Sequence, residues 1–122
     1  YGNGEDKKGD QASPVSKFVK QISESGRLRL FEDSDQFFRD FICVDDIVDI
    51  VMNNNAPSGI YDLGTSNPVS FQHVADCVID KFGGDIEYIP FPAHLVGKYQ
   101  KYTCAKNEWP DHKFITVKEY LS

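Results

Sequence analysis

The sequence predicts a mixed α/β fold, because segments with helix and strand patterns alternate along its 122 residues. Three observations support this prediction. Two segments carry apolar residues at helical spacing, a short strand-like segment follows each of them, and glycines separate the helix from the strand in both cases. With 40% hydrophobic and 13% aromatic residues over this length, the chain can bury one core but hardly two.

The first helix is predicted from Ser13 to the residue before Gly26. Ser13 is a suitable N-cap, Pro14 suits the first helical position, and apolar residues recur from Val15 to Ile22 at positions i, i+3, i+4 and i+7. The first twelve residues contain three glycines and no hydrophobic period, so they are expected to form a loop.

Two strands and a short helix are expected next. Residues 27–31 suit a strand, the acidic residues 32–35 suit a turn, and residues 37–44 suit a second strand. Asp45 is then expected to cap a helix that runs from Asp46 to about Met52 and ends in a polar asparagine run.

The second half repeats the pattern. A compact apolar strand is expected between Gly59 and Gly64, and a turn at residues 65–68. Ser70 is expected to cap a helix that ends at Gly83, followed by a strand over residues 85–89. The expected buried stripe of this helix is Phe71, Val74, Ala75, Val78, Ile79 and Phe82. Residues 91–109 show no clean period, and Thr116 with Glu119 forms a capping-box pattern for a last helix.

Composition excludes several classes of partner. The 13 basic and 19 acidic residues give a net charge of -6, which argues against general binding to nucleic acids or anionic membranes. No apolar run approaches the length of a membrane span, so a soluble, cytoplasmic protein is expected. The three cysteines, Cys43, Cys77 and Cys104, form no CxxC pair and are expected to be reduced, buried thiols.

No metal site is expected from the histidines. His73, His94 and His112 are scattered without the spacing of metal ligands, and surface positions are expected for them.

Two cationic positions are candidates for binding an anionic ligand. The Lys7-Lys8-Gly9-Asp10 cluster is either a solvated charge run or a loop that places a lysine for proton transfer, which would require burial to lower its pKa. Arg39 lies between Phe38 and Phe41 in a strand pattern, where a buried guanidinium needs a partner. That partner is either Asp40 or Asp35, or a phosphate or carboxylate of a ring-bearing ligand.

Taken together, eight segments resemble the C-terminal part of the ADP-L-glycero-D-manno-heptose 6-epimerase family, which belongs to the extended short-chain dehydrogenase/reductase superfamily. These segments are Tyr1-Gly2, Lys7-Lys8-Gly9, Phe31-Glu-Asp-Ser34, Arg39-Asp-Phe41, Gly59-Ile-Tyr-Asp-Leu-Gly-Thr65, Ser70-Phe-Gln-His-Val-Ala-Asp76, Ile86-Glu-Tyr-Ile-Pro-Phe-Pro92 and Gly97-Lys-Tyr-Gln100. The Arg39-Asp-Phe41 and Leu63-Gly-Thr65 elements are shared across nucleotide-sugar epimerases and dehydratases. The Ile86–Pro92 and Gly97–Gln100 stretches are more specific to the heptose enzyme.

The resemblance implies the C-terminal portion of an NAD(P)-binding Rossmann-type fold, with a small mixed α/β substrate domain. Residues 1–122 would then be a single substrate-binding region that lacks the N-terminal dinucleotide-binding domain. The implied enzyme is an NADP-dependent homo-oligomer that inverts C6 of ADP-D-glycero-D-manno-heptose, through a carbonyl intermediate, for the inner core of lipopolysaccharide. The isolated chain is expected to be inactive. Two alternatives stay open: another extended short-chain nucleotide-sugar epimerase or dehydratase, or a non-catalytic module that binds sugar nucleotides.

The resemblance also implies roles for particular residues. Lys8 matches the catalytic lysine, which also touches the cofactor, and Arg39 matches the arginine that binds the ADP-sugar. Asp10 and Lys17 stand where the family typically has serine and histidine, so they depart from its substrate-binding pattern. The substrate-binding residues implied are Asp10, Lys17, Phe31, Glu32, Asp33, Ser34, Arg39 and Tyr99.

Overall fold

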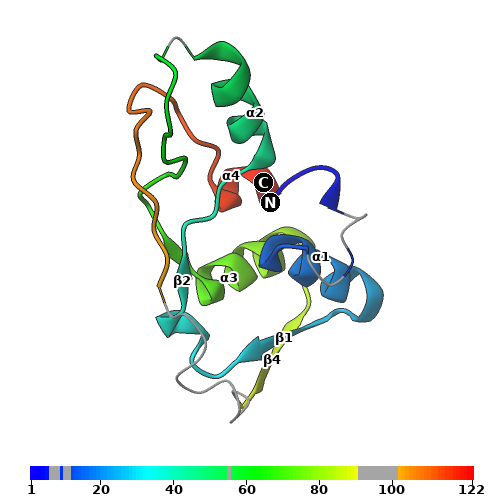
Figure 1. Cartoon of the computed structure of the whole chain (residues 1–122). Helices are drawn as coiled ribbons and strands as arrows, with labels where there is room; N and C mark the ends of the chain where they lie inside the picture. The colour runs from blue at the N-terminus through cyan, green and yellow to red at the C-terminus, as the bar shows by residue number, and fades with distance from the viewer. Residues whose placement is uncertain (6–8, 10–11, 55, 91–101) are drawn as a thin grey trace.

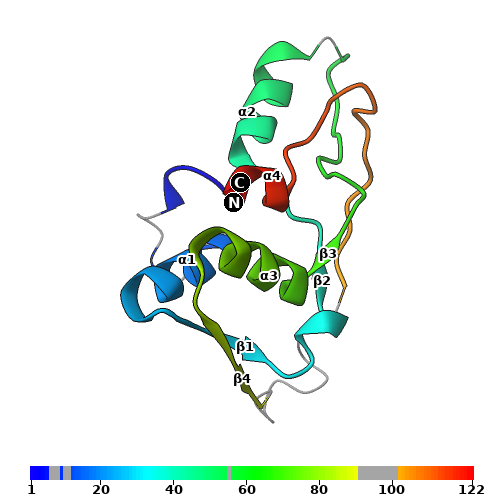
Figure 2. The ribbon, with the colours of Figure 1, turned by 180° about the vertical axis from the view of Figure 1, so that it is seen from behind.

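A computed structural model describes residues 1–5, 9, 12–54, 56–90 and 102–122. At one end of the molecule, two helices lie over a pair of parallel strands, and at the other end a third helix stands apart (Figure 1). An extended segment containing β2 runs between the two ends (Figure 1). The N- and C-termini lie close together in the middle of the molecule (Figures 1 and 2).

Helix α1 (Pro14–Ser25) forms as its sequence predicts. The Ser13 side chain accepts a hydrogen bond from the Ser16 N–H, Pro14 occupies the first helical turn, and Gly26 ends the helix with a left-handed φ of 70°. Val15, Phe18 and Ile22 form its buried face.

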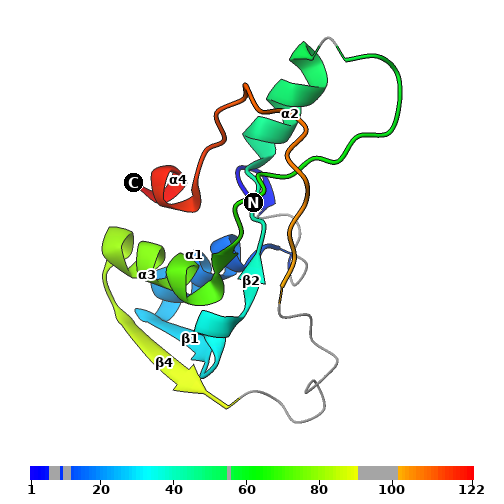
Figure 3. The ribbon, with the colours of Figure 1, turned by 90° about the vertical axis from the view of Figure 1, so that its left-hand side faces the viewer.

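Strands β1 (Arg27–Phe31) and β4 (Asp85–Ile89) pair in parallel, with Leu28 opposite Ile86 and Leu30 opposite Tyr88. Leu28 and Leu30 are buried, and β1 contacts both α1 and α3. The intervening Arg29 points to solvent, because side chains alternate between the two faces of a strand. Figure 3 shows α1 and α3 as one layer over these two strands.

Helix α3 (Phe71–Phe82) is the centre of the core. The Ser70 side chain caps it by accepting from the His73 N–H, and Gly83 ends it, as predicted. The prediction that Phe82 is buried was wrong: the last turn of α3 extends past the core, and the ring is 47% exposed. The buried core cluster consists of Val15, Phe18, Ile22, Leu28, Leu30, Phe37, Phe71, Val74, Ala75, Val78, Val117 and Leu121.

The strand predicted over residues 37–44 was too long. Strand β2 comprises only Phe38–Arg39, and it pairs antiparallel with β3 (Val69–Ser70). The next antiparallel pair would set Asp40 opposite Pro68, which has no backbone N–H to donate to the ladder. The Asp40 carboxylate accepts hydrogen bonds from the N–H groups of Thr65 and Ser66. A short 3₁₀ helix, η3 (Ser34–Gln36), precedes β2 within the segment expected to be a turn.

Helix α2 (Val44–Asn53) begins earlier than predicted, with Cys43 at the N-cap and without a side-chain cap. Asp45 lies in the first turn, where a carboxylate favours the positive end of the helix. Asp46 is buried and accepts hydrogen bonds from His112 Nε2 (2.9 Å) and the Ile115 N–H (2.9 Å). The prediction of a surface position was therefore wrong for His112, which is half-buried beside this carboxylate.

The strand predicted between Gly59 and Gly64 does not form. Leu63 makes an isolated antiparallel bridge with Asn107, which is too little to build a ladder. Within the described residues, the segment before Thr65 and the segment after Thr103 run side by side, and Figure 1 shows them as the neighbouring green and orange traces.

Helix α4 (Val117–Leu121) has the full capping box of Thr116 and Glu119 that the sequence predicts, and it packs on α3. No helix in the described part of the chain is both long and apolar enough to cross a membrane. Cys43 is buried and Cys77 half-buried, but the expectation of burial was wrong for Cys104, which lies in an exposed segment.

Candidate functional site

Arg39 extends from β2 toward the start of α3. Its guanidinium carbon lies 5.4 Å from the centroid of the Phe71 ring, and Nη1 donates a hydrogen bond to the Phe38 carbonyl at 2.9 Å. The side chain is half-buried. The ring contact and the bond to the carbonyl hold the guanidinium beside the start of α3. A planar guanidinium is a group suited to recognition of phosphate or carboxylate.

Asp40 holds three chain segments together on the other face of β2. Its carboxylate accepts hydrogen bonds from the N–H groups of Thr65, Ser66 and Ala105, at 3.1 Å to Oδ2 in each case, and from the Thr65 hydroxyl. The sequence suggested Asp40 only as an ion-pair partner for Arg39. Its adjacency to Thr65 and Ala105 is long-range, so no local pattern indicates it.

The turn held by Asp40 has a constrained backbone. Ser66 adopts a φ of 57°, which is uncommon for a residue other than glycine. Its hydroxyl donates to the Ala105 carbonyl (2.8 Å) and accepts from the Asn107 N–H (2.6 Å), while its N–H donates to Asp40. These bonds offset the cost of the left-handed conformation at a turn next to Arg39.

The acidic turn after β1 is anchored to α3. Ser34 is 1% exposed, and its hydroxyl donates to Gln72 Oε1 at 3.0 Å. The same oxygen accepts from the Tyr88 hydroxyl (3.1 Å), and Gln72 Nε2 donates to Asp76 (3.0 Å). Ser34 is thus buried and occupied by a protein contact, whereas Glu32 and Asp33 beside it are exposed. Phe31 is half-buried at the end of β1.

Two adjacent residues of α3 therefore join the parts of the candidate site. Phe71 lies under Arg39, and Gln72 holds Ser34. The Phe71 N–H also donates to the Phe37 carbonyl at 3.0 Å, which ties the helix start to the residue before β2. Sequence reasoning placed Phe71 in the core and gave no role to Gln72. The contacts of Arg39 with Phe71 and of Ser34 with Gln72 join residues far apart in the chain, so local spacing gives no signal of them.

A third segment flanks β2. Tyr102 forms an isolated parallel bridge with Phe38, their rings lie 6.3 Å apart, and the Thr103 N–H donates to the Phe38 carbonyl at 3.1 Å. A hydrogen bond with Cys104 raises the pKa of the exposed Tyr102 phenol. The arrangement places an aromatic ring with a hydroxyl against Phe38, the residue before Arg39.

Of the remaining predicted site residues, Lys17 alone lies within the described part of the chain. Lys8, Asp10 and Tyr99 lie outside the described residues. Lys17 is exposed on α1, and within the described part of the chain no contact joins it to Arg39 or to the acidic turn.

The start of the loop that contains Lys8 is well anchored. Glu5 is buried and accepts hydrogen bonds from the Gly2 N–H (3.1 Å), the Ser13 N–H (2.8 Å) and the Ser13 hydroxyl (2.9 Å). Burial opposes ionisation of this carboxyl, but the bonds from Ser13 and Gly2 outweigh it and lower its pKa.

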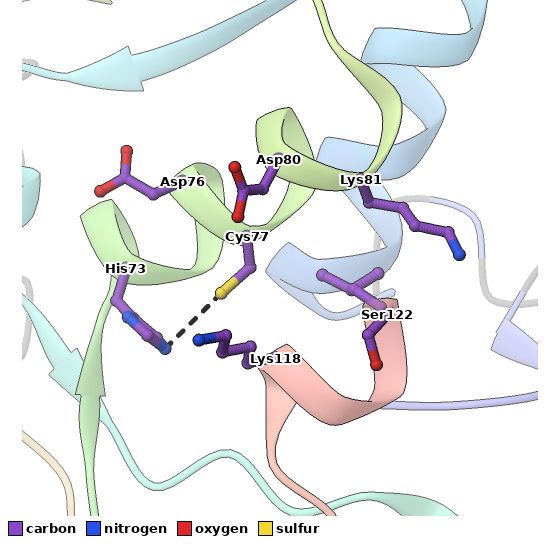
Figure 4. Close-up of a pocket in the computed structure, with 8 residues that line it drawn as sticks. His73, Asp76, Cys77, Asp80, Lys81, Lys118 and Ser122 are labelled. Carbon is purple, nitrogen blue, oxygen red and sulfur yellow. Dashed lines mark hydrogen bonds between the residues drawn. The ribbon is translucent and has the colours of Figure 1, made fainter.

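A cavity of about 450 Å³ lies between α3 and α4 (Figure 4). In it the Cys77 thiol lies 3.6 Å from His73 Nε2, one helical turn away. Burial and the nearby Asp76 carboxylate raise the pKa of Cys77, which makes the thiol a poor nucleophile. Among the described residues, no group of three or more His, Cys, Asp and Glu side chains is placed to hold a metal ion.

Comparison with known proteins confirms the resemblance. No protein-family model matches the chain. Over 114 residues it is 47% identical to the ADP-L-glycero-D-manno-heptose-6-epimerase of Alkalilimnicola ehrlichii, a match that covers 86% of this chain and 36% of that protein.

Solved structures agree on the fold. The Helicobacter pylori ADP-L-glycero-D-manno-heptose-6-epimerase superposes with a TM-score of 0.76 at 23% identity, over 99% of this chain and 39% of that one. An NAD-dependent NDP-hexosamine 5,6-dehydratase of tunicamycin biosynthesis superposes with a TM-score of 0.68 at 18% identity, over 89% of this chain and 37% of that one. The predicted mixed α/β fold is confirmed, and it is the fold of the corresponding part of these two proteins. The chain spans less than two fifths of the length of each of these three proteins.

Proposed function

We propose that this chain, which matches an ADP-L-glycero-D-manno-heptose-6-epimerase along most of its length, is the substrate-binding part of such an enzyme. The whole protein would invert C6 of ADP-D-glycero-D-manno-heptose, as a cytoplasmic homo-oligomer that supplies heptose for lipopolysaccharide. On this proposal the chain by itself binds the sugar nucleotide but does not catalyse epimerisation.

One observation carries the proposal beyond the sequence match. Arg39 and the turn that contains Ser34 are both anchored on the first two residues of α3, Phe71 and Gln72. A fixed cation beside aromatic rings suits a diphosphate attached to a nucleoside and a sugar, because the guanidinium forms charge-assisted hydrogen bonds with phosphate oxygens. We assign Arg39 to the diphosphate, and Phe31, Glu32 and Asp33 to one wall of the site, on the turn that the buried Ser34 anchors.

The described residues do not fit the nicotinamide cofactor. A dinucleotide pyrophosphate requires a glycine-rich turn that leads from a strand into a helix, whereas the turn after β1 begins with the exposed acidic pair Glu32 and Asp33. We therefore assign NADP to a part of the protein that this chain does not span. From there it would supply the redox chemistry by which hydride leaves C6 and returns to the opposite face.

The other roles in the proposal follow from the family motifs. Lys8 is the proposed acid or base for the carbinol oxygen, and the residue of this chain closest to the cofactor. Asp10 would accept hydrogen bonds from sugar hydroxyls, Lys17 would donate to a ligand oxygen, and the phenol of Tyr99 would bind the substrate.

A binding experiment tests the proposal. Arg39→Ala in the protein that carries this chain should weaken ADP-heptose binding by about 2 kcal/mol or more, roughly thirtyfold, because a charged hydrogen-bond partner is lost. Titration calorimetry measures the affinity. Arg29→Ala is the matched control, since Arg29 is an exposed arginine on β1 whose ion pair with Glu87 is long, at 3.9 Å. Equal affinities of Arg39→Ala and the unmodified protein would contradict the assigned role.

A second candidate is another nucleotide-sugar enzyme of the same fold. The similarity to the hexosamine dehydratase favours it, since that protein shares the fold at a TM-score of 0.68. Comparing ADP-heptose with UDP-hexoses in the same titration separates the two candidates. Tighter binding of a UDP-hexose would replace the heptose epimerase with this alternative.

A further inference from the structure

The hydroxyl of Tyr88, on β4, lies beside the acidic turn that follows β1. It donates a hydrogen bond to Gln72 Oε1 at 3.1 Å, and the Ser34 hydroxyl donates to the same oxygen at 3.0 Å. In Figure 3 the ends of β1 and β4 and the start of α3 lie on one side of the molecule. Ser34 is buried, whereas Tyr88 is 50% exposed, so Tyr88 is the residue of this pair that a ligand can reach.

Asp76 determines which way the Gln72 amide points. The two ends of a glutamine amide differ in chemistry, since the oxygen accepts hydrogen bonds and the nitrogen donates them. An ionised carboxylate only accepts, so Asp76 Oδ1, at 3.0 Å from Nε2, holds the amide nitrogen toward itself. Oε1 is therefore directed at the two hydroxyls, and each of them uses its hydrogen to reach it. The Tyr88 oxygen is left able to accept a hydrogen bond but not to donate one.

We propose that Tyr88 binds the substrate by accepting a hydrogen bond from it, and that Gln72 and Asp76 are positioning residues that direct the Tyr88 hydrogen away from the ligand. The inference rests on the proposed function, in which the adjoining turn is one wall of the site. A phenol whose hydrogen can rotate interacts with ligand donors and acceptors alike. With its hydrogen bonded to Gln72, Tyr88 favours a ligand group that donates over one that only accepts.

The donors of an ADP-sugar lie on its sugars and its base. The hydroxyls of the heptose and of the ribose are donors, as is the exocyclic amino group of adenine, whereas the ionised phosphates have no hydrogen to donate. The exposed carboxylates of Glu32 and Asp33 on the adjoining turn also only accept, and they repel phosphate. This side of the site is therefore matched to hydroxyl or amino groups, which agrees with the assignment of the diphosphate to Arg39.

Binding measurements with three ligands test the inference. In the protein that carries this chain, Tyr88→Phe removes the acceptor and keeps the ring, while Gln72 keeps its bond from Ser34. We expect it to weaken ADP-heptose binding about fivefold in titration calorimetry, through the loss of one neutral hydrogen bond.

ADP and inosine diphosphate (IDP) identify the donor group. If Tyr88→Phe leaves ADP binding unchanged, the donor is a heptose hydroxyl. If it weakens ADP but not IDP, whose base has an oxygen in place of the amino group, the donor is that amino group. Equal weakening of all three ligands, at an unchanged urea midpoint of unfolding, places the donor on the ribose.

Variants of Gln72 and Asp76 test the positioning roles. Asp76→Ala frees the Gln72 amide to turn, so it should weaken binding of the same ligands as Tyr88→Phe does. Exchanging the two groups, as Gln72→Glu with Asp76→Asn, presents a carboxylate oxygen to both hydroxyls and an amide to that carboxylate, and it should recover the affinity. Asp80→Ala is the matched control, since Asp80 is an exposed aspartate one turn further along α3.

The outcomes separate this inference from the proposed function. Arg39→Ala should weaken ADP and ADP-heptose alike, because both carry the diphosphate. If it does so while Tyr88→Phe binds all three ligands as the unmodified protein does, the inference is overturned and the proposed function stands. Equal losses from Tyr88→Phe and from Tyr61→Phe, which removes a hydroxyl bonded to the Pro57 carbonyl, would also overturn the inference. Failure of the unmodified protein to bind any of the three ligands would overturn both.

Discussion

Replacing Asp40 by asparagine tests whether this carboxylate organises the site around Arg39. Asp40 Oδ2 accepts three backbone N–H groups at 3.1 Å, from Thr65, Ser66 and Ala105. Asp40 Oδ1 accepts two further hydrogen bonds from Thr65, one from its backbone N–H and one from its hydroxyl. Asparagine keeps the shape and one acceptor oxygen, but it removes the charge and turns an amide NH₂ toward groups that are themselves donors.

The magnitude follows from the three backbone bonds. A hydrogen bond to a charged group contributes about 1.5–3 kcal/mol and a neutral one about 0.5–1.5 kcal/mol, so each bond loses roughly 1 kcal/mol. Because Asp40 is half-buried, water compensates part of the total, and we expect Asp40→Asn to lower the free energy of unfolding by about 2–3 kcal/mol.

Urea unfolding followed by circular dichroism measures this change. Asp111→Asn is the control, because Asp111 is an exposed aspartate in a turn, and its free energy of unfolding should change by less than about 0.5 kcal/mol. Equal midpoints for Asp40→Asn and Asp111→Asn would refute the organising role. A loss of ADP-heptose binding without a loss of stability would show instead that Asp40 contacts the ligand.

Two further predictions concern packing and protonation. Gly64→Ala should lower the free energy of unfolding by about 1–3 kcal/mol, because the new Cβ would overlap the Ala105 Cβ and lie 2.8 Å from Asp40 Oδ2. Ala105→Gly in the same chain should recover part of this loss in thermal unfolding, and no recovery would contradict the clash. Glu5→Gln should remove stability that the ionised carboxylate provides at neutral pH. Because the folded-state pKa of Glu5 lies below its usual value of 4.5, the gap between the two proteins should close as the pH falls through that folded pKa. A gap in urea midpoints that is independent of pH would contradict the linkage.

The boundaries of α1 and α3 could be predicted from the sequence because their signals are local, whereas α2, which has no side-chain cap, begins earlier than predicted. Ser13 and Ser70 cap their helices through bonds that span three residues, and Gly26 ends α1 by its own backbone conformation. Strands lack this advantage. Residues 27–31 became a strand because residues 85–89 pair with them, whereas residues 59–64 have the same kind of pattern and meet a single bridge. The strand pattern describes what a segment can pair with, and the pairing depends on residues far away in the chain.

Some residues of the candidate site could be predicted from local sequence, and others could not. Arg39 could be singled out from sequence because a cation between aromatic residues in a strand is unusual. Its supports could not be found in this way, since Ser34 and Gln72 are 38 residues apart and Asp40 and Ala105 are 65 apart. The sequence predicts that Asp40 forms an ion pair with Arg39, whereas in the structure its carboxylate accepts hydrogen bonds from backbone N–H groups.

The two helix starts are also where the ligand-binding segments are attached. Ser13 caps α1 and, together with Gly2, binds the Glu5 carboxylate, so the chain on both sides of the loop that contains Lys8 is held at one point. Ser70 caps α3, and the next two residues of that helix hold Arg39 and Ser34. The groups that we assign to the substrate therefore depend on N-terminal helix turns for their positions.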